Sequence, residues 1–466
     1  MKLKNPAIGI SDNNPFADDA LDRRKLAEAY YQIFKDVSEP LVCAIDSPWG
    51  TGKTTFINMF LKYLENQKIN CIYFNAWEND YVDDPLIPFI DEIEIIIENK
   101  NKDQDGKLKS IVNDVINKVK NTGGMLIKNS LPAVLKLATY GLINFDKSTE
   151  DEIAKVVENI TKNELEKYKV QKQSIKDFKE NLKELVKNLN NGGEEEKPLI
   201  IFIDELDRCR PNFAIELLER VKHLFNIDGI IFVLGIDREQ LCHSIRTIYG
   251  LNMDVDGYLK KFIDLNFCLP KLDYKNYIGI LFKRYNFDEY FEIRNQKNSN
   301  SEKTFLETFL EFFTNLAKTL KLTLRSIEHC FTQFSISFRL IPENHEINII
   351  VLVTLVCLKI SNSELYYGYI NKKYNELKIL EYLKGINNSN EIFETNYGIA
   401  LEIYFMDEAN EINKLKEEYN KKMRSDNLKE QNKGKLGWDI INEITTTQKL
   451  NLKSIIEKIE MMAVLR

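Results

Sequence analysis

The sequence predicts an α/β fold in which a five-stranded parallel sheet is flanked by helices and carries a helical insertion and an all-α C-terminal region. Three observations predict it. Short apolar runs alternate with segments of helical spacing, which is the pattern of a parallel sheet. Two of the runs are apolar throughout, as in strands covered on both faces. Beyond residue 270 nearly all of the chain has helical periodicity. The predicted strands lie at 41–46, 70–75, 198–205, 229–237 and 262–270.

A chain of 466 residues exceeds what one hydrophobic core usually organises, so about two or three domains are expected. The segment between the second and third predicted strands is rich in Lys, Glu, Asn and Ile, spaced as in helices. It ends with the acidic stretch NNGGEEEKP. We therefore predict a first part of the α/β core at 1–99, a helical insertion at 100–197, a second part of the core at 198–270, and a C-terminal helical lid and helical domain at 271–466.

Composition limits the partners. The net charge of -7 gives no overall attraction to nucleic acid or to an anionic membrane, although a local basic groove stays open. The seven cysteines are scattered without a CxxC pair, so reduced thiols are expected. The N-terminus lacks an apolar signal region, which favours a cytoplasmic location. We expect no membrane span, because Lys and Pro interrupt 125–145 and the run at 347–358 suits a buried helix.

The loop after the first predicted strand has the composition of a triphosphate-binding loop. Gly50 and Gly52 allow backbone amides to approach phosphate oxygens, and Lys53 can reach the β and γ phosphates. Thr54 offers a hydroxyl to magnesium. Ser47 stands where the usual pattern has glycine, so a chance Gly-Lys-Thr turn is the alternative. The predicted nucleotide contacts are Pro48, Trp49, Gly50, Thr51, Gly52, Lys53, Thr54 and Thr55.

Paired acids end the third predicted strand. Asp204 is expected to hold magnesium, and Glu205 to polarise the attacking water as general base. The alternative is a buried strand that emerges into an acidic turn. The two motifs together favour ATP and Mg²⁺ as ligands.

For several residues near these two motifs, two roles are considered. Asp207, Arg208 and Arg210 either contact a neighbouring subunit's nucleotide or form local ion pairs, and local pairing is favoured. Asp237 either senses the γ phosphate or water, or caps the helix that follows it, and the cap is favoured. Trp77 is expected to pack rather than to stack on a base.

The segments SPWGTGKTTF, YFNAWEND, IIFIDELDRCRP, FVLGIDREQL, YLKKFIDLNFCLP and LTLRSIEHCF occur in the order seen in the KAP P-loop NTPases. The chain resembles this family over roughly residues 15–335. The resemblance implies a sheet in which an extra strand separates the phosphate-loop strand from the magnesium-acid strand. It implies that Trp49 precedes the glycines, that Asp204 and Glu205 are the paired acids, and that Arg325 is a lid arginine reporting nucleotide state.

The resemblance extends to further positions. Lys260 and Lys261 lie near the place of a trans-acting arginine. Leu21, Arg23 and Arg24 are candidates to lie along the adenine, and a solvated basic turn is the alternative. It also implies a soluble bacterial-type member with a role in anti-phage defence.

We expect an ATPase that couples nucleotide state to conformational change or assembly, with Glu205, Lys53, Asp237 and Arg325 as catalytic residues. A homo-oligomer and an effector or sensor protein are the expected partners. The alternatives are a slow nucleotide-dependent switch or scaffold that gates an effector, and a nucleic-acid-stimulated ATPase.

Overall fold

The computed structural model describes residues 9–92, 175–189, 197–297, 302–341, 348–446 and 452–460, apart from positions 83, 86 and 226, together with a few isolated residues outside these ranges. The chain forms two compact units, one of Ile10–Pro270 and one of Met1–Gly9 with Lys271–Arg466. The predicted insertion at 100–197 lies mostly outside the described residues. Its described part includes a helix at 175–189, whose Phe178, Leu182 and Leu185 are buried in the core of the first unit.

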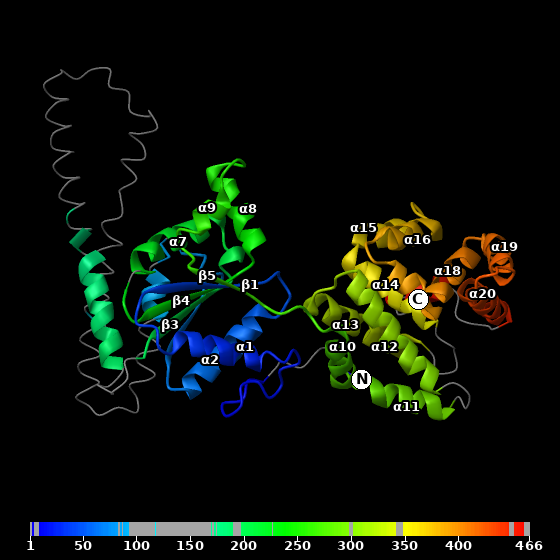
Figure 1. Cartoon of the computed structure of the whole chain (residues 1–466), viewed down its shortest axis with the longest axis horizontal. Coiled ribbons are helices and arrows are strands. Elements are labelled where there is room, and N and C mark those ends of the chain that lie inside the picture. Colours follow the sequence, from blue (N-terminus) through cyan, green and yellow to red (C-terminus); the bar gives the residue numbers. More distant parts are fainter. Residues whose placement is uncertain are drawn as a thin grey trace, which may run out of the picture. The chain divides into compact units, whose positions relative to one another are not determined.

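The first unit contains the predicted five-stranded parallel sheet, with the strand order β2-β3-β4-β1-β5 (Figure 1). The prediction of an α/β fold with this sheet is confirmed. Strand β4 lies between β1 and β3, as the family resemblance implied, so the loop strand and the acid strand are not direct neighbours. The strands are β1 (Leu41–Asp46), β2 (Asn70–Asn75), β3 (Leu199–Asp204), β4 (Ile230–Ile236) and β5 (Leu265–Cys268).

Helices cover both faces of the sheet, which is why β3 and β4 are buried along their whole length and apolar throughout. Figure 1 shows α1 and α2 on one face and α7, α8 and α9 on the other. On the first face Phe60 of α2 packs edge-on against Phe202 of β3. The helical elements of this unit are α1 (Arg24–Phe34), α2 (Lys53–Asn66), the 3-10 helix η2 (Leu206–Arg208), α7 (Pro211–Phe225), α8 (Arg238–Tyr249) and α9 (Val255–Leu259).

Among the described residues of the second unit, helices are the only regular secondary structure. Its core is rich in phenylalanine, with Phe287 packed against Phe309 and Phe331. The helices are α10 (Tyr274–Arg284), α11 (Phe287–Lys297), α12 (Glu302–Thr319), α13 (Leu324–Leu340), α14 (Ile349–Ser361), α15 (Ser363–Ile370), α16 (Glu376–Gly385), α17 (Asn390–Phe393), α18 (Asn396–Glu408), α19 (Ile412–Met423), α20 (Leu428–Thr446) and α21 (Leu452–Ile459).

The apolar run near 347–358 is a buried helix, as predicted. It forms most of α14, where Asn348 caps the N-terminus by accepting from the Val351 amide and every residue from Ile349 to Leu358 is buried. Within the described part of the chain, no helix combines the length and apolar character that crossing a bilayer requires. The other run considered, at 125–145, lies outside the described residues.

Candidate functional site

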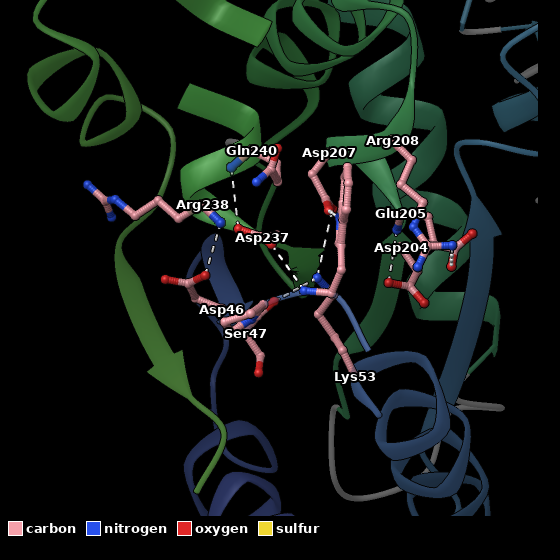
Figure 2. Close-up of polar contacts among 12 residues, drawn as sticks. Asp46, Ser47, Lys53, Asp204, Glu205, Asp207, Arg208, Asp237, Arg238 and Gln240 are labelled. Carbon is pink, nitrogen blue, oxygen red and sulfur yellow. Dashed lines mark hydrogen bonds and ion pairs between the residues drawn. The ribbon is translucent and has the colours of Figure 1, made fainter. Parts of the chain in front are cut away.

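The candidate site lies where β1, β3 and β4 end together. Parallel strands open their ligand crevice at their carboxyl ends. The register sets Asp46 of β1 against Ile236 of β4, and Asp204 of β3 against Gly235 of β4. The glycine loop follows β1, the acids end β3, and Asp237 follows β4, so chain segments far apart in sequence meet at one edge of the sheet (Figure 2).

The backbone of the loop requires glycine at two positions. Gly50 and Gly52 have φ values of 76° and 80°, a region that side chains with a Cβ rarely adopt. Gly52 is the N-cap of α2, so Lys53 begins the helix and the positive helix end lies at the loop.

Ser47 does not have a positive φ, and glycine is therefore not needed where the usual pattern places it. Its hydroxyl lies 2.6 Å from that of Thr51, which also donates to the Pro48 carbonyl at 2.7 Å. With serine in place of the usual glycine, the loop is therefore stabilised by hydrogen bonds of the Ser47 and Thr51 hydroxyls.

Arg23 fastens the loop from the outside. Its guanidinium donates to the carbonyls of Thr51 at 2.8 Å and Gly52 at 3.0 Å, and the residue is only 6% exposed. In a trans peptide the N–H points away from the carbonyl, so these bonds turn the amides of Gly52 and Lys53 away from Arg23. The guanidinium thus faces the loop backbone, whereas an adenine contact had been considered. Its neighbour Arg24 forms an exposed ion pair with Glu28 at 2.9 Å.

Lys53 is buried at the centre of the site, with 8% exposure. Its Nζ donates to the Ser47 carbonyl at 3.2 Å and lies 3.8 Å from Asp207 Oδ1. The ammonium therefore folds back over its own loop, which is the position from which it can contact a phosphate held by the loop amides.

Asp204 and Thr54, the two predicted magnesium ligands, lie near each other, since the Thr54 hydroxyl acts to lower the pKa of Asp204. Asp204 is fully buried, and its Oδ1 accepts from the Glu205 amide at 2.9 Å while Tyr73 donates to Oδ2 at 3.3 Å. Burial raises the pKa of Asp204, and the Thr54 hydroxyl, the Glu205 amide and Lys53 oppose that rise.

The oxygens of Asp204 and Thr54 have the chemistry that Mg²⁺ prefers. No cluster of three or more His, Cys, Asp or Glu side chains suited to a metal occurs in the described ranges. One carboxylate and one hydroxyl fit a magnesium ion that takes its remaining ligands from phosphate and water.

Glu205 adopts a left-handed backbone conformation with φ 60° and ψ 24°. Its carboxylate forms an ion pair with Arg208 at 2.8 Å, with the two side chains 12% and 21% exposed. The Arg208 guanidinium lies over the rings of Trp49, at 5.9 Å, and of Trp77, at 5.6 Å. Trp77 therefore packs on Arg208 while it stays half exposed.

The acidic and basic residues after β3 all have local partners. Arg208 pairs with Glu205, Arg210 with Asp80, and Asp207 with Lys53. Local pairing was the favoured interpretation for all three.

Asp237 combines two contacts. One carboxylate oxygen accepts from the Gln240 amide at 3.3 Å and so caps α8, as predicted. The other accepts from the backbone N–H of Trp49 at 3.1 Å, so the carboxylate also holds the loop. Its role toward a γ phosphate stays a prediction.

Other predicted site residues lie outside this group of contacts. Arg325 is in the first turn of α13, in the second unit, and Lys260 and Lys261 follow α9. Their roles stay predictions.

Sequence reasoning missed the loop contact of Arg23, the Tyr73 contact to Asp204, and Gly235 beside Asp204. Arg23 had been considered only for an adenine contact, and no local pattern in the sequence marks Tyr73 or Gly235.

A parallel sheet with β4 inserted between the loop strand and the acid strand, together with a glycine loop that opens a helix beside a buried acid, defines a P-loop NTPase. The sequence matches the KAP family P-loop domain over residues 23–341, more than half of the chain. The protein therefore belongs to the KAP family.

Two further similarities accompany this match. An uncharacterised protein of Methanocaldococcus jannaschii, MJ0182, is 28% identical over 176 residues, which cover 36% of this chain and 89% of the relative. The structure of the Aeropyrum pernix ORC2 protein, in ADPNP-ADP complexes, aligns over 79% of this chain and 81% of that chain, with 14% identity and a TM-score of 0.28. At this TM-score the similarity does not define the fold or the function of this protein.

Proposed function

We propose that the protein binds ATP with Mg²⁺ at this site and hydrolyses it. The observation that carries the proposal is that Thr54, at the start of the loop helix, lies close enough to the buried Asp204 at the end of β3 for its hydroxyl to lower the pKa of that carboxyl. This contact joins the two halves of a magnesium-triphosphate site that lie far apart in the sequence.

Each residue has an assigned role. The amides of the loop and the ammonium of Lys53 bind the phosphates, and Thr54 and Asp204 hold magnesium, which neutralises phosphate charge when bound. Glu205 accepts the proton of the attacking water. Asp237 and Arg325 respond to the presence of the γ phosphate.

Hydrolysis would be coupled to conformational change or to assembly into a homo-oligomer, with Lys260 or Lys261 reaching the nucleotide of the next subunit. The proposal places the protein in the cytoplasm, with an effector or sensor protein as partner and a role in bacterial anti-phage defence. The biological role rests on the family resemblance alone.

A slow nucleotide switch is the second candidate, and the ion pair between Glu205 and Arg208 favours it. A carboxylate that is paired with a guanidinium is not free to hydrogen-bond to the attacking water. Turnover of the protein by itself would then be slow, and a partner that separates the pair would accelerate it. Activation by DNA or RNA, with a steep dependence on salt, would instead support a nucleic-acid-stimulated ATPase.

The proposal is tested with Lys53→Ala and Glu205→Gln, by calorimetric titration with ATP and by phosphate release. We expect Lys53→Ala to lose nucleotide affinity, and Glu205→Gln to bind ATP with affinity near that of the wild type and to release phosphate at least about 100-fold more slowly. Wild-type affinity in Lys53→Ala would overturn the assignment of the loop. Tight binding with negligible wild-type turnover would select the switch.

A further inference from the structure

Asp207 is a buried acid that the roles above leave unexplained. It lies in η2, and its side chain is only 1% exposed. Its Oδ1 has no hydrogen-bond donor, and the structure shows just one other buried side-chain atom in that condition among the residues it describes, the hydroxyl of Ser337. A buried polar atom without a hydrogen-bond partner is costly, and native proteins keep few of them.

The carboxylate of Asp207 faces the groups that the loop offers to phosphates. Its Oδ1 lies 3.8 Å from Lys53 Nζ (Figure 2). Its Oδ2 accepts from the indole N–H of Trp49. The same carboxylate therefore contacts both the loop lysine and the loop tryptophan. A triphosphate held by the loop would meet this negative charge next to the ammonium that has to bind it.

Two opposing effects follow from this position. Without a divalent cation, Asp207 competes with the polyphosphate for Lys53 and repels it, since like charges near a buried site are poorly screened. With magnesium bound, the two added positive charges offset this repulsion. The position of Asp207 thus penalises the metal-free nucleotide more than the metal-nucleotide complex.

We propose that Asp207 is a binding-site residue that makes nucleotide affinity depend on the divalent cation. The inference rests on the proposed function, because it takes the loop to bind a magnesium nucleotide. It goes further in assigning a selection step to an acid outside the pair Asp204 and Glu205. The protein would then reject nucleotides that carry no metal.

A purely structural role predicts something different. Asp207 could serve only to hold Trp49 and Lys53 in place, in which case its loss would alter the affinity for nucleotide equally with and without metal. The ratio of the two dissociation constants separates the roles, because a general loosening of the loop cancels in it.

The test measures the dissociation constant of a non-hydrolysable ATP analogue in excess Mg²⁺ and in EDTA, for wild type and Asp207→Asn, by calorimetry. We expect the ratio of the EDTA value to the Mg²⁺ value to fall at least about tenfold in the variant. Asp228→Asn is the matched control: it removes the same charge from a residue that precedes β4, at the other edge of the sheet, and pairs there with Lys183 at 2.7 Å. Its ratio should equal that of the wild type.

The outcomes are distinct. If the wild type binds the analogue and Asp207→Asn leaves the ratio unchanged, this inference is wrong while the proposed function stands. If the wild type binds no nucleotide under either condition, the proposed function fails and this inference fails with it. A thermal melt verifies that each variant folds, and Asp207→Ser, which also removes the charge, replaces Asp207→Asn should the amide prevent folding.

Discussion

The guanidinium of Arg23 donates a hydrogen bond of 3.0 Å to the carbonyl of Gly52, the residue at which the phosphate loop becomes the helix α2. Arg23 comes from the segment before α1, so the loop is supported by a part of the chain that precedes the first strand. The contact fixes the direction of a peptide whose amide lies in the loop. It leads to the first prediction.

Arg23→Ala should weaken nucleotide binding although Arg23 is not placed against the nucleotide. Loss of two hydrogen bonds from a charged donor costs about 1–3 kcal/mol, which corresponds to roughly 5- to 150-fold in affinity if the bound loop needs them in full. Calorimetric titration with a non-hydrolysable ATP analogue measures it. Lys25→Ala removes the same charge from an exposed position two residues later and should bind normally. Equal loss in both variants would refute the loop-holding role.

Arg208→Ala should raise the basal rate of ATP hydrolysis several-fold. Removal of the guanidinium frees the Glu205 carboxylate to hydrogen-bond to the attacking water. The affinity for nucleotide should change little, so the effect falls on kcat rather than on KM. Steady-state phosphate release measures both.

Arg210→Ala is the control for this prediction, because Arg210 belongs to the same turn but pairs with Asp80. Its turnover should match that of the wild type. A fall in kcat for Arg208→Ala, with Arg210→Ala unaffected, would mean that Arg208 assists the reaction instead of restraining the base.

Gly235→Ala should damage the magnesium site. A Cβ at Gly235 would lie 2.4 Å from Asp204 Oδ1 and 2.6 Å from Ile57 Cδ1, so the carboxyl has to move and its bond to the Glu205 amide is strained. We expect magnesium-dependent turnover to fall at least about tenfold, with a loss of about 1–3 kcal/mol in stability.

Gly279→Ala is the matched glycine, because no atom lies within 4 Å of its added Cβ in α10. It should leave turnover unchanged and stabilise the helix by about 0.5–1 kcal/mol, as measured by thermal melting. If Gly235→Ala turned over like Gly279→Ala, the close approach to Asp204 would have no functional weight.

The strands and the main site residues were predictable because each has a local signature. The apolar run of β3 ends in paired acids, and the Gly50 to Thr54 segment carries its own backbone requirements. Strand order follows less directly from such patterns: β4 between β1 and β3 was implied by the family resemblance, whereas the residues by themselves indicated only a parallel sheet.

Contacts between distant segments were not predictable. The pairing of Asp204 with Gly235 depends on strand register, and that of Arg23 with Gly52 on how the first segment lies across α2. No local pattern distinguishes Gly235 from an ordinary strand glycine, or Arg23 from an ordinary surface arginine. The sequence shows that Asp207 follows the paired acids closely. Only the folded structure shows that its Oδ1 has no hydrogen-bond donor.

Asp204→Asn should stabilise the metal-free protein while it abolishes the magnesium dependence of binding. Burial raises the pKa of Asp204 above its ordinary value of 3.8, so the folded state binds the proton more tightly than the unfolded state does. Stability from this group is therefore present below pH 3.8 and is lost as the pH rises through the folded pKa. Asparagine carries no charge and should therefore raise the free energy of unfolding at pH 7.

The advantage of Asp204→Asn over the wild type should shrink as the pH falls through the folded pKa of Asp204, because the wild-type carboxyl then takes up a proton and becomes equally uncharged. Thermal melts in EDTA between about pH 4 and pH 8 measure the difference, with Asp228→Asn as an exposed control that should show no such trend. The amide oxygen of asparagine can still accept from the Glu205 backbone, so the hydrogen bond is kept while the charge is removed. A variant less stable than the wild type at pH 7 would mean that the contacts of the carboxylate with Thr54 and Lys53 outweigh its burial, and that the buried acid supports the fold as well as the metal.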